Sequence, residues 1–170
     1  ATSKPKTMYD ILNTIGIDYK KNLIGERSLT TKHYAYLKIS DGCDNPCSFC
    51  AIPIMRGGHV SKPLKEIIDE AKKLADKGIK ELLVIGQDTT YWGMDINRKR
   101  EIAKVLEALS DIDGIEWIRL MYAYPSRFPD GLMDVIANNE KVCKYIDIPI
   151  QHISDNMLKI MRRGITKKQQ

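Results

Sequence analysis

The stretch YAYLKISDGCDNPCSFC, residues 34–50, joins a strand-like run to three closely spaced cysteines. The run at 34–39 is typical of a short β-strand. Cys43, Cys47 and Cys50 follow it in a Cys-x3-Cys-x2-Cys pattern, and three thiols this close indicate a ligand set rather than a packing motif. A structural zinc site usually takes four protein ligands. A cubane iron–sulfur cluster has four irons, so three cysteines would leave one iron open to another molecule.

Two other uses of these cysteines are a disulfide and a zinc site. A disulfide is disfavoured because three clustered thiols cannot all pair, and because four cysteines in 170 residues without a recognisable signal peptide are typical of an intracellular protein. Zinc would need a fourth ligand, for which Cys143 and His59 are candidates. Cys143 lies in an apolar stretch and is expected to be a small buried hydrophobe. The glycines before His59 indicate that this histidine lies in a separate loop, which disfavours it as a ligand. A non-catalytic zinc-binding module nevertheless stays open as an alternative.

Length and composition predict one globular domain. A chain of 170 residues can bury one core, and 43% hydrophobic residues fit that class. No apolar run is long enough to span a membrane. The net charge of +5 comes with scattered lysines, which indicates a solvated basic surface or a mild attraction to RNA. The chain lacks an initiator methionine and ends in KKQQ, so we expect a segment of a longer cytoplasmic protein.

From residue 34 onward the sequence alternates four times between strand-like and helix-like segments. Strands are expected at 34–39, 81–85, 117–121 and 145–148. Helices are expected from Pro63 to a cap at Gly78, at 99–109, from a cap at Asp130 to 138, and from a cap at Ser154 to Gly164. Strand–helix–strand units with right-handed crossovers make a parallel sheet, so the fold class is α/β, and an open doubly wound sheet is one possible form.

Every candidate motif directly follows an expected strand. Cys43 follows the first, residues 86–88 the second, residues 122–126 the third and residues 149–152 the fourth. In open parallel sheets and in parallel barrels, ligands gather at the carboxyl ends of the strands. The four motifs are therefore predicted to form one site.

The residues around the cysteines resemble the radical S-adenosylmethionine (SAM) enzymes, with the aromatic Phe49 before the third cysteine. In that family three thiolates hold a 4Fe–4S cluster, and SAM chelates the fourth iron through its amine and carboxylate. One electron cleaves SAM to methionine and a 5′-deoxyadenosyl radical, which abstracts hydrogen from the substrate. The longer run ISDGCDNPCSFCAIPIMRG at 39–57 resembles the methylthiotransferases, and the stretches at 86–93 and 148–152 agree with that family.

The resemblance implies a partial parallel (β/α) barrel of the radical SAM type, with about four βα units in a core at 34–170. Residues 1–33 would be a linker or N-terminal extension. The family's N-terminal domain with a second cluster and its C-terminal β-domain would lie outside this segment. The run Gln-Asp-Thr-Thr at 87–90 resembles the branch that methylthiolates an aspartate of small-subunit ribosomal protein twelve. Methylthiolation of a tRNA adenosine is the alternative. Implied partners are the ribosomal protein, on or near the ribosome, and an electron donor such as flavodoxin.

The resemblance also assigns roles within the cysteine run. Cys43, Cys47 and Cys50 would ligate the cluster as thiolates. Phe49 would shield the cluster and form part of the adenine pocket, or it would belong to the core. Gly42 would allow a close approach of the backbone to the cluster or cofactor, or it would serve turn geometry.

The cofactor contacts are expected after the later strands. Gln87 lies where radical SAM enzymes hold the methionyl amine, and Asp88 would orient a ligand or only cap the threonines that follow. Ser126 or Arg127 would reach the carboxylate or ribose of SAM, with an exposed Arg127 as the alternative. Gln151 would lie near the ribose or adenine.

Three further polar residues need an explanation. Arg119 and Asp147 interrupt apolar strands, and because unpaired burial of a charge is costly, they are expected to pair inside the barrel or to line the cofactor pocket. His152 is expected to be a structural hydrogen-bonding residue rather than a catalytic base.

Overall fold

A computed structural model describes residues 31–170. Its centre is a parallel sheet in the order β1-β4-β5, formed by β1 (Tyr34–Lys38), β4 (Glu81–Ile85) and β5 (Trp117–Leu120). Leu37 lies opposite Val84, which in turn lies opposite Leu120. The strands predicted at 34–39, 81–85 and 117–121 are therefore confirmed to within one residue. Residues 1–30 of the predicted linker or N-terminal extension lie outside the described residues.

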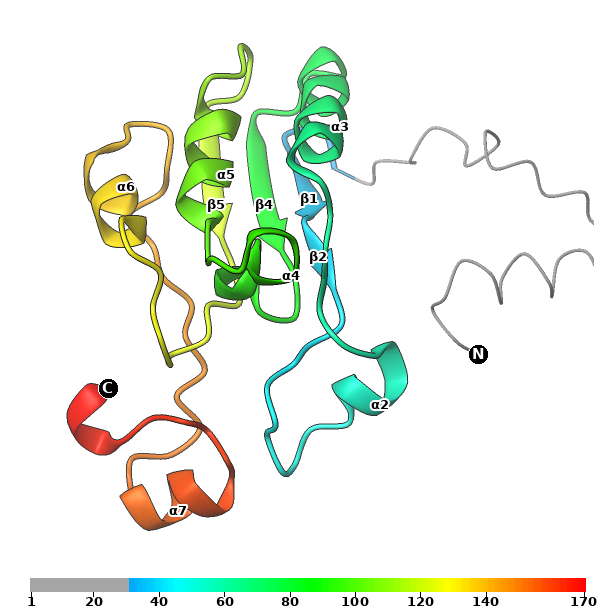
Figure 1. Cartoon of the computed structure of the whole chain (residues 1–170). Coiled ribbons are helices and arrows are strands. Elements are labelled where there is room, and N and C mark those ends of the chain that lie inside the picture. The colour runs from blue at the N-terminus through cyan, green and yellow to red at the C-terminus, as the bar shows by residue number, and fades with distance from the viewer. Residues whose placement is uncertain (1–30) are drawn as a thin grey trace, which may run out of the picture.

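Three helices cover one face of this sheet, α3 (Leu64–Asp76), α5 (Ile102–Ser110) and α6 (Leu132–Asn138), as Figure 1 shows. The helix α3 buries Ile67, Ala71 and Leu74, whose spacing of four and three residues puts them on one side of a helix. The predicted start after Pro63 is confirmed, and Gly78 ends the helix with a φ of 85°, a conformation that favours glycine.

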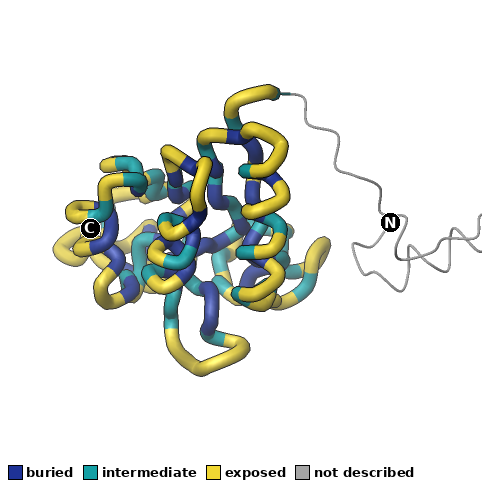
Figure 2. The backbone as a smooth tube through the Cα atoms, turned by 90° about the horizontal axis from the view of Figure 1, so that it is seen from above, coloured by how far each residue is buried: buried dark blue, intermediate teal, exposed yellow. Residues whose placement is uncertain are grey.

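The two faces of the sheet differ in burial because successive side chains of a strand point to opposite sides. Leu37, Leu82 and Ile118 lie on the covered face and are fully buried. On the other face Tyr36 is 46% exposed, and Arg119 is partly exposed. Figure 2 shows the buried stretches concentrated in the middle of the molecule, beneath exposed turns.

The two charged residues that interrupt the predicted strands, Arg119 and Asp147, have different partners. Arg119 forms an ion pair with Glu81 of the neighbouring strand, with 2.8 Å between Nε and Oε1. Its guanidinium also lies 5.1 Å from the centre of the Tyr145 ring. Asp147 is not its partner, and its backbone carbonyl accepts a hydrogen bond from the backbone N–H of Ala123 at 2.9 Å. Arg119 is therefore paired on the face of the sheet that the helices leave uncovered. This agrees with the prediction that its charge is paired, although its partner is Glu81.

The strand predicted at 145–148 is wrong. The backbone of this part of the chain pairs with β5 through an isolated parallel bridge between Ile118 and Val142. A tight turn follows, in which the backbone N–H of Tyr145 donates to the carbonyl of Cys143 at 2.7 Å, and this turn takes the chain off the ladder. Three paired strands and one bridged segment, with helices on one face, still form the predicted partial parallel barrel with about four βα units.

Two helix starts differ from the prediction, and a third agrees with it in position. A short helix α4 (Met94–Asn97) precedes α5, and Arg98 between them has a φ of 58°, so α5 begins at Ile102 rather than at 99. Asp130 is not the cap of α6, because that position belongs to Gly131. Ser154 occupies the cap position of α7 (Asp155–Ile160), although its side chain makes no capping hydrogen bond.

Several short elements that the periodicity did not predict lie at the carboxyl end of the sheet. They are the hairpin of β2 (Ser40–Asp41) and β3 (Val60–Ser61), the helix α2 (Ile52–Arg56), and the 3-10 turns η2 (Thr89–Tyr91) and η3 (Lys167–Gln169). Gly42 has a φ of 69°, and a Cβ there would lie 2.0 Å from the carbonyl oxygen of Gly58. This contact with the neighbouring turn agrees with the predicted turn geometry, whereas an approach of the backbone to the cluster or cofactor stays a prediction. Within residues 31–170, no helix has both the length and the apolar character needed to cross a membrane.

A candidate site around the cysteine loop

The cysteine loop (residues 42–51) leaves the sheet at its carboxyl end and is held at both ends. At its base the backbone N–H of Cys43 donates to the carbonyl of Gly57 at 3.2 Å. At its tip Ser48 donates twice to the C-terminal segment (residues 145–170), from its N–H to Met161 at 3.1 Å and from its hydroxyl to Ile160 at 3.0 Å. The orange and red C-terminal segment lies beside the loop at the lower end of Figure 1.

Two of the three sulfurs are surrounded by hydrogen-bond donors. Asn45 directs its backbone N–H and its side-chain amide at Cys43 Sγ, both at 3.4 Å. Cys47 Sγ lies 3.3 Å from an Nη of Arg163 and 3.4 Å from the hydroxyl of Tyr124. Burial raises the pKa of the Cys43 thiol, and the hydrogen bonds from Asn45 oppose that effect. Donors of this kind stabilise sulfur in its charged, metal-binding form.

The donor set fits an iron–sulfur cluster better than a single ion. In residues 31–170 no three His, Cys, Asp or Glu side chains converge closely enough to hold one metal ion. Ligands of one zinc all lie within about 2.3 Å of the metal, whereas each cysteine of a cluster binds a different iron. Among the described residues, no hydrogen bond joins the side chain of either candidate for a fourth zinc ligand to one of the three cysteines. His59 is buried and bonded to the Ser61 hydroxyl at 3.1 Å, and Cys143, partly exposed rather than buried, follows the bridge to β5.

The turn after β4 is tied to the cysteine loop through Asp88. This carboxylate is 1% exposed and accepts hydrogen bonds from the side-chain amide of Asn45 at 2.8 Å and from the hydroxyl of Thr90 at 2.6 Å. The bond from Thr90 agrees with the predicted contact to the threonines that follow, whereas orientation of a ligand by Asp88 stays a prediction. Next to it, the side-chain carbonyl of Gln87 is buried and has no hydrogen-bond partner among the described residues. A buried acceptor without a donor is costly, and an amine from a ligand would satisfy it.

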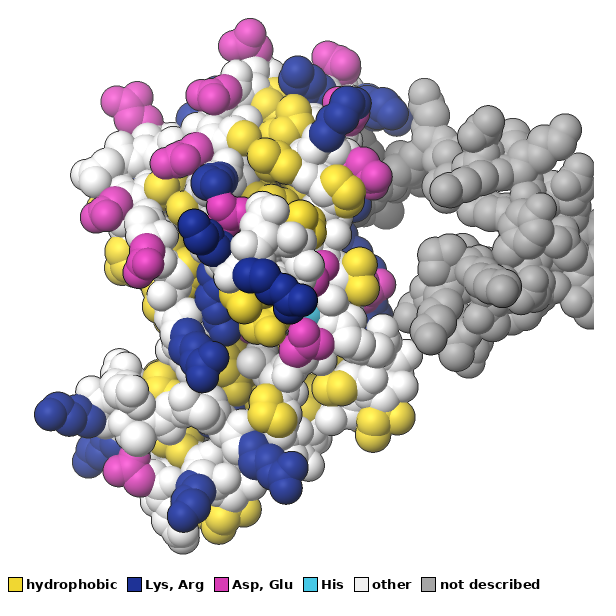
Figure 3. Space-filling model, in the orientation of Figure 1, with side chains coloured by type: hydrophobic (Ala, Val, Ile, Leu, Met, Phe, Trp, Pro, Cys, Tyr) yellow, Lys and Arg dark blue, Asp and Glu magenta, His cyan; other side chains and the backbone are white. Residues whose placement is uncertain are grey.

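A cavity of about 270 Å³ opens beside the loop. It is lined by residues 44–46 of the loop, by Tyr91 and Arg100, by Tyr124, Ser126 and Arg127 after β5, and by residues 162–164 after α7. Four of these residues are arginines, which makes the cavity suited to an anionic group. Figure 3 shows Lys and Arg side chains predominating on the lower part of the visible face, over the C-terminal segment. Burial lowers the pKa of Arg100, and the nearby Asp88 opposes that shift.

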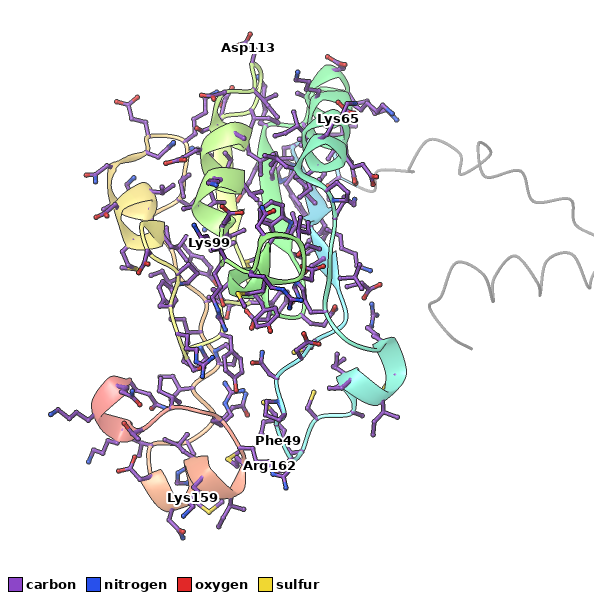
Figure 4. All side chains as sticks on the ribbon, in the orientation of Figure 1. Phe49, Lys65, Lys99, Asp113, Lys159 and Arg162 are labelled. Carbon is purple, nitrogen blue, oxygen red and sulfur yellow. The ribbon has the colours of Figure 1, made fainter. Side chains whose placement is uncertain are left out.

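Three predicted cofactor residues, Phe49, Gln87 and Gln151, are not among the residues that line this cavity. Phe49 is 52% exposed at the tip of the loop, so it does not belong to the core. Figure 4 shows it close to Arg162 of the C-terminal segment. Gln151 is exposed and has a φ of 73°. His152 is exposed as well, and its Nδ1 accepts a hydrogen bond from the backbone N–H of Ser154 at 2.9 Å, which fits the predicted structural role.

The sequence reasoning missed Asn45, Tyr124 and Arg163. Tyr124 lies in a run that was singled out after the third strand, so only its identity was overlooked. Arg163 lies 116 residues from the cysteine it touches, and no local pattern relates the two. The backbone of this end gives a further sign: Tyr122 and Arg162, which are not glycines, have φ values of 59° and 54°. Such strained positions concentrate at functional sites.

Comparison with known proteins agrees with this geometry. The model of the radical SAM superfamily matches residues 37–170. Ribosomal protein uS12 methylthiotransferase RimO of Flavobacterium johnsoniae is 57% identical over 92% of this chain and 36% of that protein. The enzyme of the same name from Chloroherpeton thalassium is 54% identical over 96% of this chain and 38% of that protein. The chain therefore spans somewhat more than a third of these curated relatives.

Solved structures resemble the fold. The radical SAM methyltransferase TsrM from Kitasatospora setae, with cobalamin and a 4Fe–4S cluster bound, has a TM-score of 0.59. Its identity is 22%, over 78% of this chain and 26% of that one. The cobalamin-dependent SAM radical enzyme OxsB has a TM-score of 0.57 at 15% identity, over 82% of this chain and 21% of that one. At these identities the likeness concerns the fold alone, and it confirms the predicted fold class.

Proposed function

The chain belongs to the radical SAM superfamily, and on that premise we propose that it is the SAM-cleaving core of a methylthiotransferase that modifies an aspartate of ribosomal protein uS12. The observation that carries the proposal is that three thiols and a buried, unpartnered Gln87 carbonyl follow the carboxyl ends of two neighbouring strands of one sheet. A ligand with an amine and a carboxylate would meet an acceptor and several arginines there.

The residues that would hold the cluster are Cys43, Cys47 and Cys50. When bound, a 4Fe–4S cluster would supply the electron that cleaves SAM and generates the carbon radical needed to remove a hydrogen from the substrate. Asn45 donates to Cys43 Sγ and also to Asp88, so one amide side chain fixes the loop against the turn after β4. This contact would keep the first thiol in place beside the cofactor.

The residues after the strands would bind SAM. The Gln87 carbonyl would accept a hydrogen bond from the methionyl amine. Ser126 and Arg127, which line the cavity, would face the carboxylate or the ribose. Phe49 and Gln151, both exposed, would contact the adenosyl part from outside the cavity, where an aromatic ring and an amide could cover it.

The substrate assignment rests on similarity along most of this chain. Relatives named uS12 methylthiotransferases are 54–57% identical to it over more than nine-tenths of its length. The Gln-Asp-Thr-Thr run at 87–90 supports the same branch. We infer that SAM serves twice, as radical source and as methyl donor, and that the electron comes from a flavodoxin-like donor in the cytoplasm, near the ribosome.

The test begins with anaerobic reconstitution of the chain with iron and sulfide. Low-temperature electron paramagnetic resonance of the reduced protein, with and without SAM, is expected to give a 4Fe–4S signal that shifts when SAM binds. Zinc uptake without a cluster signal would overturn the proposal and favour the binding module. Incubation of the complete enzyme with purified uS12 and, separately, with tRNA then decides the substrate: modification of tRNA alone would contradict the aspartate assignment.

A further inference from the structure

Arg163 is the most constrained charged side chain near the cysteines. It is 4% exposed, although arginine is almost never fully buried unless it is paired. One Nη donates to Cys47 Sγ at 3.3 Å, and the other donates to the backbone carbonyl of Pro149. The plane of its guanidinium lies over the ring of Tyr124, with 4.3 Å between Cζ and the ring centre.

Tyr124 contacts both Arg163 and Cys47. Its hydroxyl donates to the backbone carbonyl of Arg163 at 2.9 Å and lies 3.4 Å from Cys47 Sγ. The tyrosine is itself 6% exposed. The thiol therefore meets a guanidinium and a phenol that hold each other in place, and the geometry does not depend on one flexible side chain.

The charge of Arg163 lacks an obvious counterion. No carboxylate within residues 31–170 forms an ion pair with it, and its Nε is buried without a hydrogen-bond partner. A buried, unpaired charge is strongly unfavourable, so a partner for it is expected within the fold. Of the groups among residues 31–170 that contact this guanidinium, the sulfur of Cys47 is the one that binds metal as an anion.

We propose that Arg163 is a positioning residue that raises the reduction potential of the cluster through its hydrogen bond to the Cys47 sulfur. This inference rests on the proposed function, because it requires a cluster on the three cysteines. Reduction adds one electron, which makes the cluster and its thiolates more negative. A cation and a hydrogen-bond donor on a ligand sulfur stabilise that state more than the oxidised one.

The same contact links the cluster to the C-terminal segment. Arg163 follows α7, and Ser48 of the loop bonds to the two residues that end and follow that helix. Docking of this segment would therefore bring the positive charge to the sulfur. The cluster would be easier to reduce when the segment is seated than when it is displaced.

Three variants isolate the effect. Arg163→Met removes the charge and the hydrogen bond but keeps an unbranched apolar side chain. Arg163→Lys keeps the charge and loses the planar pair of donors, so a smaller change is expected. Arg162→Met is the matched control, because Arg162 lines the same cavity and carries the same charge, yet is exposed.

The measurement is a redox titration of the reconstituted full chain, followed by electron paramagnetic resonance without SAM. Arg163→Met is expected to reduce the equilibrium constant for cluster reduction about tenfold, which lowers the midpoint potential by about 59 mV for a one-electron couple. Arg162→Met is expected to leave the midpoint where it is in the wild-type chain. Iron content and thermal unfolding are recorded for each protein.

Two results would overturn the inference: a loaded Arg163→Met cluster with the wild-type midpoint, or an equal shift in Arg162→Met. If Arg163→Met takes up no iron, Arg163→Lys and Tyr124→Phe decide, since both are expected to lower the midpoint and unchanged values in both would refute the role. A wild-type chain without any cluster would overturn the proposed function itself, and this inference with it. The wild-type signal therefore distinguishes the two failures.

Discussion

The covered face of the sheet and its carboxyl end are built from the same three strands, yet they follow opposite rules. On the covered face, Leu37, Leu82 and Ile118 pack against α3, α5 and α6 and are fully buried. Apolar side chains there have no hydrogen bonds to satisfy, so close packing is sufficient. This face supplies the stability of the fold.

At the carboxyl end, buried polar atoms are left without partners. Four such side-chain atoms are found in residues 31–170, and all of them lie at this end: Ser40 Oγ, His59 Nδ1, Gln87 Oε1 and Arg163 Nε. Each unsatisfied group costs about 1–3 kcal/mol. Within residues 31–170, buried side-chain atoms without partners are therefore confined to the end of the sheet where the candidate ligand site lies, and the covered face has none.

The largest expected effect separates the two regions by function. Cys50→Ala is expected to abolish cluster binding, because only two thiols would be left. It is expected to change unfolding of the cluster-free chain little, since Cys50 is partly exposed and lies outside the hydrophobic core. Iron and sulfide analysis after anaerobic reconstitution measures the first effect, and urea unfolding measures the second.

Cys143→Ala is the matched control for that experiment. It removes a thiol that follows the bridge at the edge of β5 and should leave cluster content at the wild-type level. An equal loss of iron in Cys143→Ala would mean that the fourth cysteine takes part in the site, and the contrast between the regions would fail.

The reverse experiment weakens the covered face. Leu106 is fully buried in α5, and Leu106→Ala is expected to lower the free energy of unfolding by about 2–5 kcal/mol because it leaves a cavity. Ile54 in α2, beside the cysteine loop, is 89% exposed, so Ile54→Ala should change stability by less than about 0.5 kcal/mol. Urea denaturation of both cluster-free variants checks this. Similar losses in the two variants would show that α2 contributes to the core.

The same contrast explains what the sequence could predict. The strand at 81–85 was predicted to the residue because its apolar run is a local signal. The segment at 145–148 also carries apolar side chains, but it would be a strand only if its backbone paired with β5. The turn at Cys143 and Tyr145 prevents that pairing. The three cysteines were singled out because their spacing is itself local. Arg163 was not, because its contact to Cys47 exists only once the C-terminal segment has folded against the loop.

A smaller effect is expected where the two regions are joined. The two carboxylate oxygens of Asp88 accept hydrogen bonds from Asn45 and from Thr90. Asp88→Asn replaces one of these oxygens with an NH₂ group, which cannot accept. We expect a loss of about 1–3 kcal/mol in unfolding free energy and faster reaction of Cys43 with a thiol reagent. Asp113→Asn, in an exposed turn at the opposite end of the molecule in Figure 4, is the control and should change neither quantity. Unchanged Cys43 reactivity in Asp88→Asn would contradict the proposed tie.

The smallest expected effect is a pH dependence that arises at the carboxyl end alone. Burial lowers the pKa of His59 below its usual value, although Asp95, Asp88 and Asp44 oppose the shift. The unfolded chain therefore binds a proton on this histidine at a higher pH than the folded chain does. Stability from neutral His59 is present above the unfolded pKa of about 6.5 and is lost as the pH falls below it, by at most about 1.4 kcal/mol per pH unit.

Urea unfolding as a function of pH tests this prediction against its control. His59→Gln should flatten the decline below about pH 6.5, whereas His152→Gln, which alters an exposed histidine, should leave the slope unchanged. A decline that persists in His59→Gln would assign it to the carboxylates around the loop instead. In either case the slope of unfolding free energy against pH reports on polar groups buried at the carboxyl end. The side chains that the sheet directs to the covered face are apolar, so none of them titrates in this range.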